Sequence, residues 1–361
     1  MFEIPLHAAF KQDAWDEAAA VLSRATESRQ VASATLYVFQ QGREQAWAFG
    51  NAQDEHAMFL LGSISKPIAI ASLMTLFDKG AFQLADPLKK FIPAFAGEGR
   101  ENVTMRHLLT HVSGLPDQLT DNNSLRRQHA PLSTFVEYAI RTPLEFAPGS
   151  KYQYSSMAIL LASHVAELIS GEDICKLVDR VVLQPLGMTH SAQGLGRFLL
   201  TQLVAVQTEF AAVEAGGGDP TAKDWDWNSP YWRELGAPWG GTHASAPDIG
   251  KFLAEFLLKK GTVVRPETAK MMVSNQNPAT LESRGMAFDV GSSLGGEGCS
   301  ERVFGHTGST GTIAWADPQS QTICVVLTSL PANAVKPHPR DLAAGQIARP
   351  LPAAPRYRPC W

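Results

Sequence analysis

The segment 63–79 is predicted to form a helix that is apolar on nearly every side, and this constrains the fold more than any other feature of the chain. Its apolar side chains are Ile68, Ala69, Ile70, Ala71, Leu73, Met74, Leu76 and Phe77. A helix without a polar face must be enclosed by other layers of structure. A chain of 361 residues can build such a core. We therefore expect this helix inside a layered domain, ending near Gly80.

The two ends of the chain are predicted to form one body around that helix. Strand-like runs lie at 31–39, 45–49, 303–304, 312–316 and 322–327. Helical patterns near the ends lie at 13–29, 247–260 and 340–348. The middle has helical segments at 103–111, 132–142, 156–170 and 175–182. We predict an α+β fold, with an antiparallel sheet flanked by helices in a body formed by 1–80 and 241–361. A mainly helical domain, 81–240, is inserted, and a ligand site is expected in the groove between the two parts.

Composition argues against several classes of partner. The chain is 45% hydrophobic and 18% charged, with a formal net charge of -4 and no long basic run, which argues against nucleic acid or a membrane surface. The longest apolar stretch, 157–162, is too short to cross a bilayer. The first residues lack the pattern of a secretory signal, so a cytoplasmic location is expected. The four cysteines show no zinc-ligand spacing, and neither disulfides, a metal nor another cofactor is expected.

The start of the apolar helix carries the sharpest chemical pattern, a serine and a lysine three residues apart. Ser63 and Lys66 would share one face of the helix. A serine hydroxyl becomes a good nucleophile only when a base takes its proton, and a lysine can be that base if burial lowers its pKa. The alternative is structural, with Ser63 capping the helix and Lys66 solvated in its first turn. The motif by itself leaves both interpretations open.

Two later segments help to decide between the catalytic and the structural interpretation of Ser63 and Lys66. Residues 147–156 read APGSKYQYSS, and residues 304–312 read FGHTGSTGT. With the serine–lysine pair, these motifs resemble the serine β-lactamase and penicillin-binding-protein superfamily. The closest resemblance is to the branch that holds class C β-lactamases, peptidases that process D-amino acids, and family VIII carboxylesterases. It runs from about residue 30 to residue 330 and includes the connecting segments 84–88, 106–116 and 185–189.

The resemblance implies a role for each matching residue. Ser63 would form the acyl-enzyme, Lys66 would assist its deprotonation, and Tyr154 would be the acid–base partner that passes a proton to the leaving group. The backbone N–H groups of Ser63 and Ser309 would form the oxyanion hole. Tyr152 is the alternative to Tyr154, which is favoured because it directly precedes the two serines and the next helix. The choice of general base between Lys66 and Tyr154 stays open.

The chain departs from the family pattern at two positions that would contact substrate. Ser156 stands where the family usually has Asn, and His306 replaces the Lys of the family's Lys-Thr-Gly strand, here followed by Thr307 and Gly308. A neutral imidazole binds an anion less well than an ammonium does. Both changes favour esters without an obligatory carboxylate over β-lactams.

The tryptophan-rich segment, 225–239, offers a further candidate for substrate binding. It holds four of the eight tryptophans and ends at Trp239. These rings either pin a long loop to the body or wall the pocket for the acyl or alcohol group. With His306, Thr307, Gly308 and Ser156, Trp239 completes the predicted substrate-binding set.

Other patterns carry less weight. His107 and His111 are spaced like zinc ligands, but the chain offers neither the glutamate of the zinc-protease motif nor a third ligand. The sequence therefore predicts a serine hydrolase that acts on small carboxylic esters. The alternatives are an amide hydrolase (a D-aminopeptidase, a D,D-peptidase or a weak β-lactamase) and a catalytically silent scaffold of the same fold.

Overall fold

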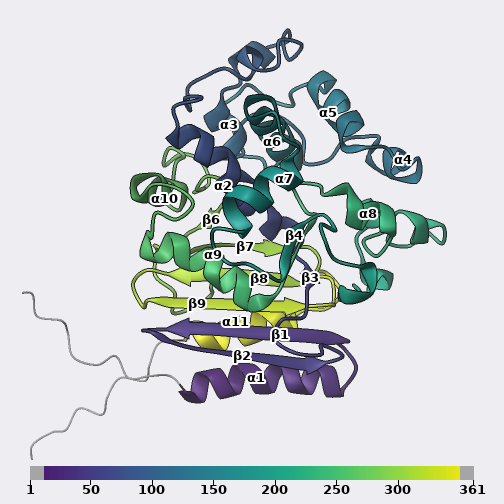
Figure 1. Cartoon of the computed structure of the whole chain (residues 1–361), viewed down its shortest axis with the longest axis vertical. Coiled ribbons are helices and arrows are strands. Elements are labelled where there is room, and N and C mark those ends of the chain that lie inside the picture. The colour runs from purple at the N-terminus through teal and green to yellow at the C-terminus, as the bar shows by residue number, and fades with distance from the viewer. Residues whose placement is uncertain (1–11, 350–361) are drawn as a thin grey trace, which may run out of the picture.

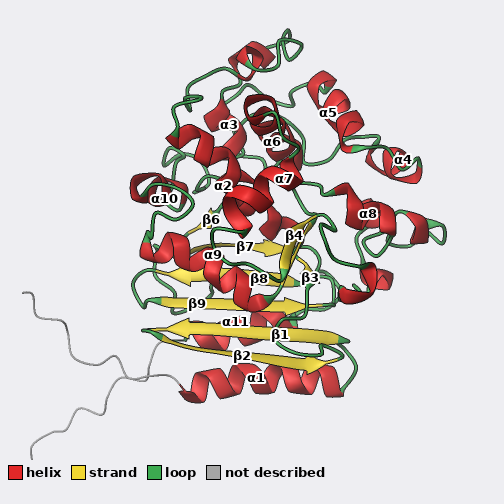
Figure 2. Cartoon of the chain, viewed as in Figure 1, coloured by secondary structure: helices red, strands yellow, loops and turns green. Residues whose placement is uncertain are grey.

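A six-stranded antiparallel sheet is the foundation of the fold, as the computed structural model shows for residues 12–349 (Figures 1 and 2). The order of its strands is β2-β1-β9-β8-β7-β6. Their bounds are β1 Ser33–Gln40, β2 Arg43–Gly50, β6 Asp289–Val290, β7 Phe304–Gly308, β8 Thr312–Asp317 and β9 Thr322–Thr328. The N-terminal strand β1 pairs directly with β9, so both ends of the chain build this sheet, and the predicted fold class is confirmed.

The helices occupy both faces of the sheet and the region above it. Their bounds are α1 Gln12–Glu27, α2 Ser65–Asp78, α3 Met105–Leu109, α4 Asn122–Arg127, α5 Leu132–Arg141, α6 Ser156–Ser170, α7 Ile174–Val178, α8 Pro230–Leu235, α9 Ala246–Leu258, α10 Pro266–Met272 and α11 Pro339–Ala348. Helices α1 and α11 cover one face of the sheet, and α9 covers the other (Figure 1).

The central strands are buried along almost their whole length, as expected for a sheet covered on both faces. On β1, Leu36 and Val38 point into the cluster formed with α1 and α11, whereas Tyr37 points into the larger core on the side of α9. Successive side chains of a strand face opposite sides of the sheet. Because both faces are covered by helices, successive residues of a strand can be apolar without being exposed.

Helix α2 lies in the interior, as predicted for a helix that is apolar on nearly every side, and it begins at Ser65 rather than at Ser63. Twelve of its residues, Ser65 through Leu76, are buried. It packs against α6 and α7 of the helical region, and the short 3₁₀ turn that precedes it, Gly62–Ile64, packs against β7 and β8. The start of α2 is therefore held between the helical region and the sheet.

Several short elements were not predicted. They include α4, α8, α10 and a three-stranded sheet of order β3-β5-β4, with β3 Phe59–Leu60, β4 Ser191–Gln193 and β5 Thr242–Ala244. Helix α8 interrupts the tryptophan-rich segment: the Ser229 hydroxyl accepts a hydrogen bond from Trp232 N, and Gly236 ends the helix with a φ of +63°. Two- and three-residue strands give too little alternation to be recognised in a sequence.

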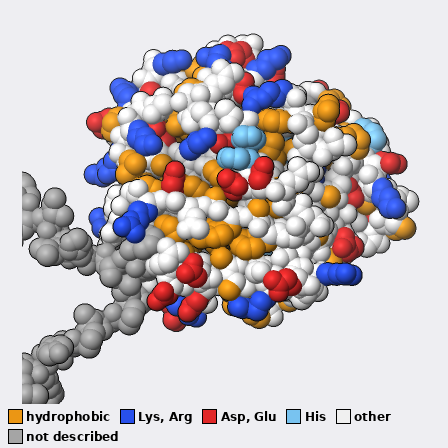
Figure 3. Space-filling view, turned by 60° about the horizontal axis from the view of Figure 1, so that its bottom comes forward, with side chains coloured by type: hydrophobic (Ala, Val, Ile, Leu, Met, Phe, Trp, Pro, Cys, Tyr) orange, Lys and Arg blue, Asp and Glu red, His pale blue; other side chains and the backbone are white. Residues whose placement is uncertain are grey.

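The division into a body and an inserted domain stays a prediction. The small sheet joins β3 and β5, which belong to the proposed body, to β4, which lies within 81–240. Within residues 12–349, no helix is both long and apolar enough to cross a bilayer. On the face shown in Figure 3, basic and acidic side chains are interspersed. Cys360 and the terminal segments used for the location prediction lie outside the described residues.

Candidate active site

Ser63 lies in a turn that the neighbouring strands hold in place. The preceding Gly62 has a φ of +57°, and a β carbon there would stand 3.1 Å from the backbone N of Ser309. Beside it, Thr310 Oγ1 donates to Leu60 O at 2.7 Å. A glycine is thus required for both the backbone conformation and the close approach. These contacts bring the backbone around Ser63 and that of Ser309 to one place, as an oxyanion hole needs.

Lys66 is buried beside Ser63 and bonded to it. Lys66 is only 1% exposed to solvent. Its Nζ lies 2.9 Å from Ser63 Oγ and donates to the carbonyl oxygen of Trp239 at 2.9 Å. Burial lowers the pKa of Lys66 to about 7; the charge of Asp117 opposes this shift and that of Arg284 adds to it. Near neutral pH a large fraction of the amine is therefore unprotonated and able to accept a proton.

Tyr154 completes the cluster. Its ring centroid lies 4.7 Å from Lys66 Nζ, and its side chain contacts that of Ser63. Burial raises the pKa of Tyr154, while the positive charge of Arg284 and the contact with Ser63 act in the opposite direction. The tyrosine therefore stays protonated at neutral pH and can donate a hydrogen bond. Tyr152, the alternative, packs edge-on against His111 and does not line the pocket at Ser63.

The ring of His111 packs against that of Tyr154. Its ring centroid lies 4.7 Å from that of Tyr154, and its Nδ1 accepts a hydrogen bond from Ser155 N at 3.1 Å. The other histidine of the pair considered for zinc, His107, bonds with Thr104 at the start of α3. No group of three or more possible metal ligands exists within residues 12–349.

His306 is neutral and occupied on both ring nitrogens. Arg284 Nη2 donates to Nε2 at 2.7 Å, and Nδ1 lies 2.6 Å from the carbonyl oxygen of Thr307. Burial, and then the charge of Arg284, lower the pKa of His306 well below 6.5. Arg284 also forms an ion pair with Asp289. The imidazole thus has no nitrogen left to bind substrate, and its partner Arg284 was not identified from the sequence because an isolated arginine in a loop carries no local signal.

Thr307 and Gly308 lie on β7 next to the nucleophile turn. Gly308 packs against the backbone of Leu61, which leaves no room for a side chain. Neither residue lines the pocket that contains Ser63. Their arrangement fixes where β7 ends and therefore where the backbone N of Ser309 lies.

Ser156 holds an acidic residue close to the lysine. The Ser156 hydroxyl donates to Asp117 Oδ1 at 2.6 Å, and its backbone N–H donates to the same oxygen at 2.9 Å. The Asp117 carboxylate raises the pKa of Lys66, although burial outweighs it. Asp117 directly follows a segment, 106–116, on which the family resemblance rests, but no sequence pattern indicated that it would meet Ser156.

A pocket of about 160 Å³ opens at Ser63. Three tryptophans of the segment 225–239 line it: Trp227, Trp232 and Trp239. The other residues on its wall are Gly62, Ser63, Asp117, Gln118, Arg126, Tyr154, Ser156, Glu214, Ala215, Gly240 and Ser309. The tryptophan-rich segment therefore contributes to the pocket wall as well as to the core, and the space suits a small acyl or alcohol group.

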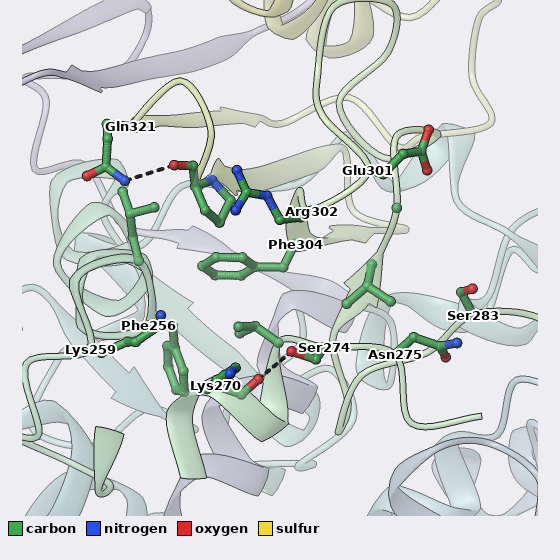
Figure 4. A pocket seen from close by; sticks show the side chains of 15 residues that line it. Phe256, Lys259, Lys270, Ser274, Asn275, Ser283, Glu301, Arg302, Phe304 and Gln321 are labelled. Atoms are coloured by element: carbon green, nitrogen blue, oxygen red, sulfur yellow. Dashed lines mark hydrogen bonds between the residues drawn. The ribbon is translucent and has the colours of Figure 1, made fainter. Parts of the chain in front are cut away.

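A larger pocket, of about 490 Å³, lies between the end of α9, α10 and β7 (Figure 4). Phe256 and Phe304 point into it, and its lining includes neither Ser63, Lys66 nor Tyr154. Ser274 in this pocket donates its hydroxyl to the backbone carbonyl of Lys270 at 2.6 Å, so it is not paired with a base. This pocket is larger than the one at Ser63, but it holds no serine paired with a lysine, so we place the active site in the smaller pocket.

Comparison with known proteins agrees with this geometry. The family model described as Beta-lactamase matches residues 18–349. Esterase EstB of Burkholderia gladioli is 32% identical over 206 residues, which span 50% of this chain and 52% of that protein. A putative D-alanyl-D-alanine carboxypeptidase of Escherichia coli K12 is 24% identical over 308 residues, covering 76% of this chain and 70% of that protein.

Solved structures show the same fold. EstCE1, described as a hydrolase with promiscuous acyltransferase activity, superimposes with a TM-score of 0.75 at 19% identity, covering 94% of this chain and 99% of that one. D-amino acid amidase from Ochrobactrum anthropi SV3 gives a TM-score of 0.75 at 18% identity, covering 93% and 99%. The family model spans most of the chain and the fold agrees throughout. The chain therefore belongs to the Beta-lactamase family, a family of serine hydrolases.

Proposed function

We propose that this protein hydrolyses small carboxylic esters through an acyl-enzyme on Ser63. The observation that carries the proposal is the contact between Ser63 Oγ and a buried lysine whose pKa is about 7. A lysine with that pKa can accept the serine proton at neutral pH, which an ordinary surface lysine cannot. A scaffold would gain nothing from a lysine held without its charge.

The contacts support a two-step mechanism. Ser63 Oγ attacks the ester carbonyl carbon while its proton passes to the pair formed by Lys66 and Tyr154. The backbone N–H groups of Ser63 and Ser309 stabilise the oxyanion. The intermediate collapses to the acyl-enzyme, and the alcohol leaves with a proton returned by the same pair. Water then attacks the acyl carbonyl and gives a proton to the pair. The pair passes this proton to the departing Oγ of Ser63, so the carboxylic acid and the free serine are released.

Two features favour esters over amides and β-lactams. His306, at the family's lysine position, is neutral and has partners on both nitrogens. Ser156, at the family's asparagine position, uses its hydroxyl on Asp117. Neither side chain offers the free ammonium or amide that the family pattern supplies.

The test is a direct comparison of acyl donors with the purified protein. We expect turnover of p-nitrophenyl acetate and butyrate, a covalent acyl adduct by intact mass, and labelling by a fluorophosphonate. Nitrocefin and D-alanine p-nitroanilide should be turned over more slowly. Faster turnover of either amide would replace the ester proposal by the amidase alternative, and absence of labelling and of all turnover would support the scaffold.

Tyr154→Phe is expected to lower kcat/KM for p-nitrophenyl butyrate by about 10²- to 10⁴-fold, since it removes the hydroxyl that relays the proton. Tyr152→Phe is the matched control, because Tyr152 does not line the pocket. Steady-state kinetics on both variants checks the assignment. Equal losses, or a greater loss in Tyr152→Phe, would reverse it.

Two substitutions should move the pH–rate profile in opposite directions. Arg284 lowers the pKa of Lys66 and Asp117 raises it. If unprotonated Lys66 is the base, the acidic limb of kcat/KM should shift to higher pH in Arg284→Met and to lower pH in Asp117→Asn. Profiles between pH 5 and pH 9 measure both. Shifts of the same sign would show that another group controls this limb.

A further inference from the structure

A buried arginine with two unsatisfied nitrogen atoms lies on the wall of the active-site pocket. Arg126 belongs to α4, is 3% exposed, and lines the same pocket as Ser63. Its guanidinium carbon stands 3.9 Å from the centroid of the Trp232 ring, so the indole supports one face of the cation. Helix α4 was not predicted, and the mechanism proposed above does not use Arg126.

The guanidinium is left with unsatisfied donors. Its Nε and Nη1 atoms are buried and have no hydrogen-bond partner. Burial lowers the pKa of Arg126 to about 10, which keeps the side chain charged at neutral pH. A buried cation without a counter-ion is costly, and the cost falls when an anion binds. Such a group on the wall of a pocket points to an anionic ligand.

The acidic residues of the pocket do not neutralise it. Asp117 is held by Ser156, and Glu214 is exposed, although its charge does raise the pKa of Arg126. Neither forms an ion pair with Arg126 among residues 12–349. By contrast, the adjacent and more exposed Arg127 is paired with Asp219 at 2.7 Å. Of these two neighbouring arginines, the exposed Arg127 has a carboxylate partner, whereas the buried Arg126 has none in the described part of the chain.

We propose that Arg126 binds a carboxylate of the substrate, so that the preferred esters are half-esters of short dicarboxylic acids or similarly small esters that carry one free carboxylate. This inference rests on the proposed function and specifies its substrate class. The pocket of about 160 Å³, with walls of Trp227, Trp232 and Trp239, accommodates a short apolar stem between the ester and the anion. The sequence favoured esters without an obligatory carboxylate because His306 is a poor anion site, and here Arg126 of α4 takes that role, while His306 on β7 is neutral and occupied.

The test measures binding without turnover. In the Ser63→Ala background, isothermal titration should show tighter binding of monomethyl glutarate than of dimethyl glutarate, which has the same chain but no charge. Adding Arg126→Met should weaken binding of monomethyl glutarate by about 10- to 100-fold, as expected for loss of a hydrogen-bonded charge, and remove the preference. Arg126→Lys, which keeps the charge, should retain part of it.

Arg127→Met is the matched control and should keep the preference for the half-ester. Equal affinity of the Ser63→Ala protein for both compounds, or no binding of monomethyl glutarate, would overturn the inference without any Arg126 variant being needed. Separate assays with wild-type protein distinguish the two proposals. If neutral esters are turned over but half-esters are not preferred, the hydrolase proposal holds and the anion site is wrong. If half-esters bind through Arg126 but no ester is turned over, the anion site holds and the hydrolase proposal is wrong.

Discussion

Ser63→Ala is expected to lower kcat/KM for p-nitrophenyl acetate and butyrate by about 10⁴- to 10⁶-fold and to abolish the acyl adduct. The loss is large because the hydroxyl forms the covalent bond, and the members of such a catalytic unit act together rather than additively. The structure should tolerate the change, since it removes one atom at the edge of a pocket. The measurements are steady-state kinetics and intact mass after incubation with ester.

The control for this variant is Ser150→Ala, which removes an exposed serine hydroxyl that bonds to Ala147 O. It should retain both turnover and the adduct. An acyl adduct that persists in Ser63→Ala would show that another residue is the nucleophile, and peptide mapping would then locate it.

Lys66→Met should have two opposite effects: loss of about 10⁴-fold in kcat/KM and a gain in stability at pH 7. The rate falls because the base is removed. Stability rises because folding holds the pKa of Lys66 at about 7 instead of 10.5. At pH 7 this difference costs about 4 kcal/mol, because about half of the amine in the folded protein is then unprotonated. The two hydrogen bonds of Nζ offset about 1 kcal/mol each, so a net gain of about 2–3 kcal/mol is expected.

The lowered pKa of Lys66 also predicts how the stability of the protein changes with pH. Between pH 7 and pH 10.5 the unfolded chain holds the Lys66 proton and the folded protein does not. Stability of the wild type therefore rises with pH through this window, and Lys66→Met should remove that part of the slope. Urea unfolding at pH 7 and pH 9 measures both proteins, with Lys79→Met, at the exposed end of the same helix, as the control for losing a lysine. A destabilised Lys66→Met with an unchanged slope would contradict the argument.

The sequence was sufficient for the main elements because their patterns are long. The predicted helix 156–170 coincides with α6, and 132–142 differs from α5 by one residue. By contrast, α4 has six residues and β3 two, and such lengths carry too little periodicity to be recognised. Because α4 supplies Arg126, the failure to predict this helix also meant that Arg126 was not recognised as part of the pocket.

The sequence by itself determined that a serine and a lysine lie three residues apart at the start of a helix that must be buried. From this follow the central position of α2 and the candidate chemistry, because local spacing and apolar content depend only on neighbouring residues. Tertiary structure alone decided which distant groups surround that pair. Arg284, Asp117 and Arg126 come from separate loops and helices, and their distances to the site are set by packing. Electrostatic effects depend on those distances and on burial, so the pKa of Lys66 and the unpaired charge of Arg126 could be known only from the folded chain.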